Sequence, residues 1–218
     1  MVRTSFDTSL QELHNHILRM GSIVEKQIYN SVKSLIDKDI ELADKVIKND
    51  DLVDTAEKEI EDMAIKLIAT QQPLAVDLRD IFTTTKIVTD LERIADHAVD
   101  ISKITKKLIG ESYIKELTFI PKIAYIVNNM VKDSLDAYVQ SDVHGAYEVC
   151  KRDDEVDALY KSVFKEMVEV MGKDVKYTNQ ATQFLFVCKF LERIADHATN
   201  ICEWTIYMVT GKQVDLNE

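Results

Sequence analysis

Two identical eight-residue segments each contain a pair of carboxylates whose spacing could support chemistry. Residues 91–98 and 191–198 both read LERIADHA. In each copy a glutamate and an aspartate stand four positions apart, which places both on one face of a helix. Like charges at this spacing destabilise an isolated helix, so a purely structural helix would more often alternate acids with bases there. Carboxylate oxygens are hard ligands, so the chemistry that this pattern favours is binding of Mg²⁺, Ca²⁺, Mn²⁺ or ferric iron.

The polar stripe continues for one more turn in each copy, and a second acidic pair lies upstream of each motif. We expect the upstream pair and the motif to lie on neighbouring helices, where their side chains converge. The candidate cation ligands are Asp50, Asp54, Glu92, Asp96 and Asp100 in the first copy, and Asp153, Asp157, Glu192, Asp196 and Asn200 in the second. Because Asn200 replaces the aspartate found at position 100, the second stripe has one formal charge fewer.

A single acidic pair on a helix is usually no more than a solvated face. The duplication changes this interpretation, because apolar packing alone would tolerate exchanges among Leu, Ile and Val. It would not keep Glu, Arg, Asp and His identical in two copies. We interpret His97 and His197 as surface or interhelix hydrogen-bonding residues rather than ligands, and the motif arginines as partners of acids on the next helix.

The sequence contains no recognisable catalytic signature. A ferritin-like di-iron site needs a histidine three residues after Glu92, where Ala95 stands, and no H-E-x-x-H, P-loop or G-x-S-x-G motif occurs. We therefore predict a non-enzymatic chain that binds metal cations, and iron, Mg, Mn, Ca and Zn are all candidates. Two other interpretations stay open: a metal-dependent enzyme or iron-handling helical protein, and a chaperone-like bundle whose acids contact a basic partner.

Composition limits the fold and the partners. The 218 residues include only 5 Gly and 2 Pro, so turns are scarce and many-stranded folds are disfavoured. The formal charge of −11 argues against a nucleic-acid partner, because such binding depends on cations that displace counterions from phosphates. No segment has the length and hydropathy of a membrane span or a signal peptide, and the three cysteines form no C-x-x-C pair. We expect a cytoplasmic protein that meets membranes only through partners, with Cys150, Cys188 and Cys202 as small core residues.

The motifs belong to a tandem duplication that covers the chain. VIKNDDLVD at 46–54 matches VCKRDDEVD at 149–157, and Gly110 and Gly211 follow the two motifs at nearly equal distances. Helix formers dominate, and apolar residues recur at spacings of three and four. The pattern predicts an all-α fold of two tandem three-helix bundles, divided into residues 1–112 and 113–218. The predicted helices span residues 4–36, 40–69, 73–109, 118–140, 142–171 and 178–210.

With both motifs in place, the chain resembles the PhoU family of phosphate-uptake regulators. The similarity includes LRMGSIVEKQI at 18–28, QQPLAVDLRDI at 71–81 and ERIADHATNICEW at 192–204. This resemblance implies a homodimeric negative regulator that acts with the cytoplasmic subunit of a phosphate ABC transporter and with a sensor histidine kinase. It also implies iron or other cations on E(D)-x-x-x-D motifs, which fall here on Glu92 with Asp96 and on Glu192 with Asp196.

Overall fold

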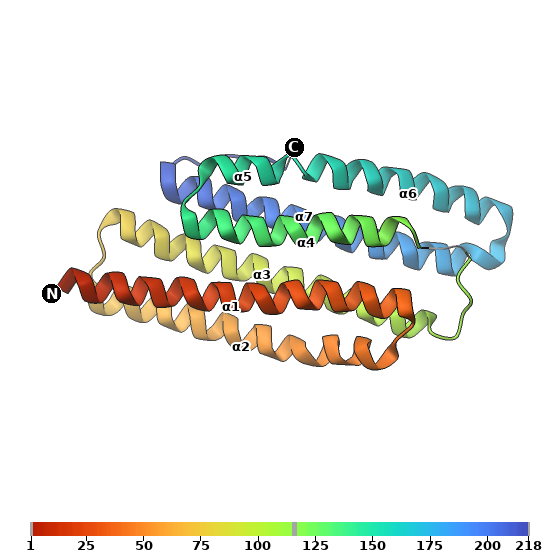
Figure 1. The fold of residues 1–218 in the computed structure, drawn as a ribbon, viewed down its shortest axis with the longest axis horizontal. Coiled ribbons are helices and arrows are strands. Elements are labelled where there is room, and N and C mark those ends of the chain that lie inside the picture. Colours follow the sequence, from red (N-terminus) through yellow and green to blue (C-terminus); the bar gives the residue numbers. More distant parts are fainter. Residues whose placement is uncertain (1, 115–116, 218) are drawn as a thin grey trace.

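The computed structural model describes residues 2–114 and 117–217, with side chains from Phe6 onward. These residues form long α-helices, one short 3₁₀ turn (Val175–Tyr177) and no strand, which confirms the all-α prediction (Figure 1). The helices are α1 (Val2–Asp37), α2 (Ile40–Gln71), α3 (Ala75–Leu108), α4 (Phe119–Gln140), α5 (Val143–Cys150), α6 (Asp153–Lys173) and α7 (Thr178–Thr210). No helix in these described ranges is both long and apolar enough to cross a membrane.

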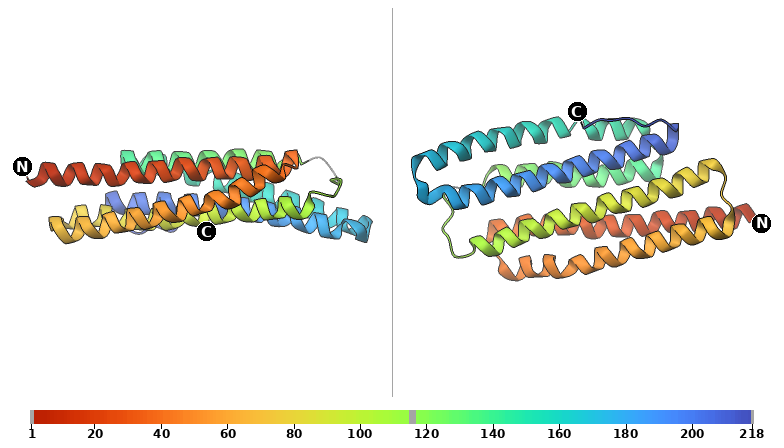
Figure 2. Two further views of the ribbon diagram at one scale, coloured as in Figure 1. Left: turned by 90° about the horizontal axis from the view of Figure 1, so that it is seen from below. Right: turned by 180° about the vertical axis from the view of Figure 1, so that it is seen from behind.

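The helices form two bundles side by side, α1–α3 and α4–α7, with their long axes roughly aligned (Figures 1 and 2). Helices α3 and α7, which carry the two LERIADHA motifs, pack more extensively against each other than any other pair of described elements. Helix α1 also packs against α4 across the same division. The prediction of tandem bundles is confirmed, whereas the boundary between residues 112 and 113 stays a prediction within the connection from α3 to α4.

One predicted helix is wrong. The continuous helix expected over 142–171 is divided into α5 and α6, which are separated by Lys151 and Arg152. Arg152 lies between the two helices, and its guanidinium pairs with Asp133 of α4 at 2.5 Å. The charge order around the break suits two helix ends, because cations are favoured near a helix C-terminus and anions near an N-terminus. Asp153, Asp154 and Glu155 accordingly form the first turn of α6.

The residues of the two motifs have matching burial. Leu91, Ile94, Ala95 and Ala98 are fully buried, as are their counterparts one hundred residues later. The acids and histidines of both motifs are partly exposed at matching positions. Cys188 and Cys202 are buried in the core as predicted, whereas Cys150 is only partly buried. Within the motif, each repeat therefore has its polar residues beside the same buried apolar stripe.

Candidate metal centres and the interface between the repeats

The first acidic cluster lies between α2 and α3. Burial, followed by the charges of Asp96 and Asp54, raises the pKa of Asp50 to about 6. Burial also raises the pKa of Glu92 to about 7, with further contributions from Asp96, Glu57 and Asp54 that Arg93 partly offsets. Carboxylates on two helices therefore act on one another, as the sequence predicted. Their mutual repulsion opposes folding unless protons or a cation neutralise them.

Glu57 belongs to this cluster although sequence reasoning missed it. Its pKa is raised by burial and then by Glu61 and Asp54. The available signal was its position three residues after Asp54, since residues three apart share a helix face. The first cluster thus has five interacting carboxylates: Asp50, Asp54, Glu57, Glu92 and Asp96.

The second acidic cluster repeats this arrangement between α6 and α7. Burial, followed by Asp196, Asp157 and Glu192, raises the pKa of Asp153 to about 6. The pKa of Asp196 is also raised, by burial and then by Glu192. One oxygen of Asp153, Oδ1, is buried without a hydrogen-bond partner among the described residues. An uncompensated buried carboxylate oxygen of this kind fits a cation ligand.

The two clusters differ in charge. The alignment that matches 46–54 with 149–157 places Tyr160 where the first repeat has Glu57. Lys189 adds a positive charge to the second cluster, whereas the equivalent position of the first repeat is Thr89. The Lys189 ammonium donates to Glu192 Oε1 at 2.6 Å. The first cluster is therefore the more negative, because it has one more carboxylate and lacks this lysine.

Several of these acids are held by cations on their own helices. Arg93 donates to Asp96 at 2.9 Å, and Lys161 donates to Asp157 at 2.8 Å. Within the described ranges, no three His, Cys, Asp or Glu side chains are grouped closely enough to hold a metal ion. The oxygen donor set fits a hard cation. Binding would require some of these carboxylates to turn away from exposed basic side chains, at small energetic cost.

The outer members of the predicted stripes lie apart from the clusters. Asp100 pairs with Lys103 at 2.9 Å. Asn200 donates through Nδ2 to Asp90 at 3.1 Å, and its side-chain oxygen accepts from Asn217 at 2.8 Å. The difference between Asp100 and Asn200 therefore concerns the contact between the repeats more directly than the charge of the second cluster.

The motif histidines meet at the contact between α3 and α7. His197 Nδ1 lies 2.8 Å from Asp90 Oδ1, and Asp90 is only 8% exposed. His97 stacks on Phe190 with ring centroids 5.6 Å apart, and it lies 5.8 Å from the His197 ring. Positions 90 and 190 are equivalent in the two repeats, so each contacts the motif histidine of the other repeat.

The contact between α3 and α7 sets the protonation state of His97 and the partners of both histidines. Burial and the neighbouring His197 lower the pKa of His97 to about 4, so His97 is neutral near pH 7. The interhelix hydrogen bond predicted for the histidines is formed by His197, whereas His97 packs against an aromatic ring. Sequence reasoning missed Asp90, whose only signal is a charge directly before the apolar start of the motif.

A second polar contact joins the halves near the N-terminus of α3. His14 Nε2 lies 3.0 Å from Asp80 Oδ1, and the Tyr138 hydroxyl donates to the same oxygen at 3.4 Å. The hydroxyls of Tyr138 and Thr84 are 2.7 Å apart. Side chains from α1, α3 and α4 therefore share one partly buried network between the two bundles.

Comparison with known proteins agrees with this duplicated geometry. The PhoU domain family matches residues 17–105 and again residues 120–205. The chain belongs to the PhoU family. It is 56% identical over 219 residues to a Clostridium acetobutylicum protein named phosphate-specific transport system accessory protein PhoU homolog, and the match covers 100% of both chains. A Rhizobium meliloti protein of the same name is 37% identical, with 97% of this chain and 90% of that protein covered.

Solved PhoU structures have the same fold. The crystal structure of PhoU from Pseudomonas aeruginosa superposes with a TM-score of 0.90 at 36% identity, covering 95% of this chain and 100% of that chain. The phosphate transport system regulatory protein PhoU from Streptococcus pneumoniae gives a TM-score of 0.89 at 29% identity, covering 96% and 99%. Both PhoU domains therefore have the fold of the solved structures, and each contains one acidic cluster.

The raised pKa values in the PhoU clusters predict a pH dependence of stability. A carboxyl group with a higher pKa in the folded chain binds its proton more tightly there, so it contributes most to stability below its unfolded pKa. That contribution is lost as the pH rises through the folded values of about 6 for Asp50 and Asp153 and about 7 for Glu92. In chelator, the melting temperature should therefore fall between about pH 5 and pH 7.5 more steeply for the native chain than for a triple variant, D50N/E92Q/D153N.

Melting curves recorded by circular dichroism at several pH values measure this difference in slope. The two proteins should converge near pH 5 and separate by a few degrees near pH 7.5, with the triple variant the more stable. Parallel pH profiles would show that these carboxylates do not repel one another in the folded chain.

Proposed function

We propose that this chain is a non-enzymatic regulator of phosphate uptake. The observation that carries the proposal is the match of two PhoU domains over nearly the whole chain, together with 56% identity to a protein named as an accessory to phosphate-specific transport. In this proposal the chain works in the cytoplasm as a dimer. It contacts the cytoplasmic subunit of a phosphate ABC transporter and a sensor histidine kinase, and it represses phosphate-starvation genes when phosphate is plentiful.

A regulatory rather than catalytic role is also supported by the use of the motif histidines. Histidine is the commonest general base in enzymes. His197 is bonded to Asp90 and His97 is stacked on Phe190, so both are used in the contact between repeats. The acidic clusters are likewise shared between helices of one bundle, where a bound ion would stabilise structure.

The proposal includes cation binding at both clusters. Asp50, Asp54, Glu57, Glu92 and Asp96 would hold cations between α2 and α3. Asp153, Asp157, Glu192 and Asp196 would do so between α6 and α7. A bound cation supplies positive charge that neutralises the converging carboxylates. The raised pKa values of these groups and the unpartnered Asp153 Oδ1 support this assignment.

Deleting the gene from its host tests the regulatory role. In phosphate-rich medium, the deletion strain should express a phosphate-starvation reporter that the parent strain keeps silent. A plasmid copy of the gene should restore repression, and an empty plasmid should not. Normal repression in the deletion strain would contradict the proposal. Binding of the purified chain to the isolated cytoplasmic region of the sensor kinase tests the second partner separately.

A further inference from the structure

Aromatic and basic side chains gather where α3 begins and α7 ends. Phe82 and Trp204 meet edge to face at a centroid distance of 6.0 Å, and Trp204 meets Tyr207 in the same way at 6.1 Å. Beside them, a hollow of about 420 Å³ is bordered by Leu78 and Tyr207. We call this surface the aromatic–cationic patch, comprising Leu78, Arg79, Phe82, Lys86, Trp204 and Tyr207.

Much of the patch is open to solvent. Phe82 and Leu78 are each 44% exposed. Ile68 of α2 borders the same hollow and is 40% exposed. A contiguous group of exposed apolar side chains from three helices is unfavourable in water unless another surface covers it. The patch also lies away from both acidic clusters along the helices, so cation binding does not account for it.

The two basic residues of the patch contact rings instead of carboxylates. The Lys86 ammonium lies 5.5 Å from the centre of Phe82 and 5.6 Å from that of Trp204. The Arg79 guanidinium lies 6.0 Å from the centre of Tyr207, and its Nε is buried without a hydrogen bond to any described residue. No carboxylate in the described ranges forms an ion pair with either side chain.

This is unusual in a chain of net charge −11, where acids outnumber bases. The acids near these helix ends have partners other than Arg79 and Lys86. Asp77 accepts from the Leu74 amide, and Glu203 accepts from the Leu216 amide. Asp80 pairs with His14. Arg79 and Lys86 therefore keep positive charge beside exposed apolar rings. The complementary surface has apolar side chains flanked by carboxylates.

We propose that the aromatic–cationic patch docks an acidic amphipathic segment of a protein of the phosphate transport system. The partner's apolar side chains would cover Phe82 and Trp204, and its carboxylates would pair with Arg79 and Lys86. The inference rests on the proposed function for the identity of the partner, and it adds the surface used and the chemistry recognised.

An anionic membrane fits these observations less well. Segments that bind acidic lipids usually cluster about four to eight basic residues, whereas the patch has two. The overall charge of −11 would also repel an extended anionic bilayer. A single docked segment, by contrast, needs to pair only with the two basic residues beside it, because charges beyond about 10 Å are screened by salt. A protein segment with its own apolar face is therefore the better occupant.

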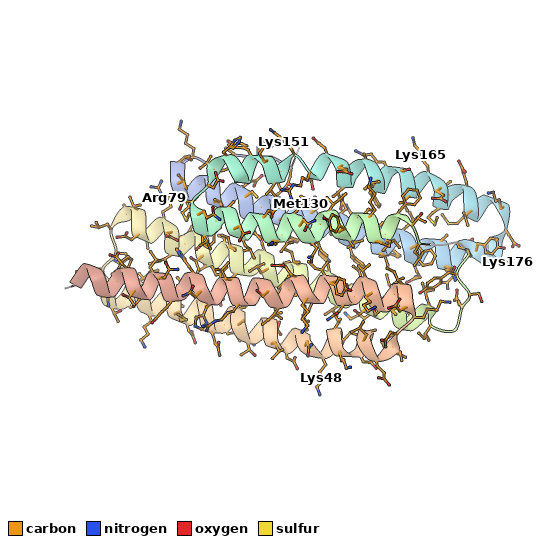
Figure 3. The ribbon with its side chains drawn as sticks, viewed as in Figure 1. Lys48, Arg79, Met130, Lys151, Lys165 and Lys176 are labelled. Carbon is orange, nitrogen blue, oxygen red and sulfur yellow. The ribbon has the colours of Figure 1, made fainter. Side chains whose placement is uncertain are left out.

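Matched substitutions on two faces test the proposal. Phe82→Glu changes the patch, and Phe164→Glu makes the same change on α6 at a similar exposure, 44% against 48%. Lys86→Glu and Lys165→Glu form the second pair. Figure 3 labels Lys165 on α6, well separated from Arg79 along the molecule. Circular dichroism and the melting temperature establish that each variant is folded.

Affinity is measured for the purified host phosphate transporter in nanodiscs of zwitterionic lipid, so that no anionic lipid contributes. Phe82→Glu should weaken binding at least about tenfold, because a charge would replace a central apolar contact. Lys86→Glu should weaken it roughly tenfold and Lys86→Met less, because only the former repels an acidic partner. Phe164→Glu and Lys165→Glu should bind as the native chain does.

Four results would overturn the proposal. If the native chain binds but patch and control variants behave alike, the docking surface is wrong while the proposed function stands. If the native chain does not bind the transporter, both fail. Loss of binding to phosphatidylglycerol vesicles by patch variants, with transporter binding intact, would assign the patch to membranes. A change of oligomeric state confined to Phe82→Glu, measured by light scattering, would assign it to a contact between two copies.

Discussion

Adding Mn²⁺ to the chelator-treated protein should raise its melting temperature, and the double substitution D96N/D196N should abolish this rise. A ligand that binds only the folded chain stabilises it by RT ln(1 + [L]/Kd), which is ~2.7 kcal/mol at a hundredfold excess over Kd. For a chain of 218 residues this corresponds to roughly 5–10 °C. Asp96 and Asp196 are suitable targets because each acts electrostatically on the facing helix, on Asp50 and Asp153 respectively.

The matched control is D51N/D154N. Asp51 and Asp154 directly follow Asp50 and Asp153, at equivalent positions of the two repeats, and both are exposed. The formal charge changes by the same amount, and Asp51 and Asp154 act on Asp50 and Asp153 more weakly than Asp96 and Asp196 do, so the control should keep most of the metal-dependent rise. In chelator near pH 7, D96N/D196N should be slightly more stable than the native chain, since it removes repulsion and leaves the core unchanged.

The single variants separate the two centres. The first cluster has Glu57 where the second has Tyr160, and it lacks the positive charge of Lys189. Calorimetric titration should therefore lose its tighter phase in Asp96→Asn and its weaker phase in Asp196→Asn. A double variant that binds Mn²⁺ normally and loses stability in chelator would show that these acids serve as structural ion-pair partners.

The long helices could be predicted from the sequence because their signals are local and redundant. The apolar spacing from Leu91 to Ile101 fixes the buried face of α3, and its repetition from Leu191 to Ile201 does the same for α7. The break at Lys151 and Arg152 was not predicted from the sequence; Arg152 pairs there with Asp133 in another helix, a contact that local spacing does not reveal. Helix propensity alone does not report such a tertiary contact.

In the candidate site, too, local patterns could be predicted from the sequence and tertiary contacts could not. Asp50, Glu92 and their counterparts could be found because helical spacing and duplication place them on facing stripes. The roles of Asp90 and Phe190 could not be found, because they depend on how the repeats pack against each other. The motifs are identical, yet position 90 is acidic and position 190 aromatic, so the two motif histidines have different partners.

This asymmetric contact predicts a large effect from a single substitution. Asp90→Ala should lower the free energy of unfolding by about 2–4 kcal/mol, because Asp90 Oδ1 accepts from both His197 and Asn200 and its loss leaves two partly buried donors unpaired. Asp90→Asn should cost less, since its amide oxygen can still accept one of these hydrogen bonds. Urea denaturation at pH 7.5 in chelator measures both values.

Asp44→Ala provides the control, because it removes an exposed carboxylate that pairs with Lys106 at the surface. Exposed pairs of this kind contribute about 0–1 kcal/mol. If Asp90→Ala costs no more than Asp44→Ala, water satisfies His197 and Asn200 equally well and Asp90 does not join the repeats. If the large cost is observed, the contact between α3 and α7 depends on one carboxylate that the duplication did not preserve. The two PhoU domains would then be held together by residues in which they differ.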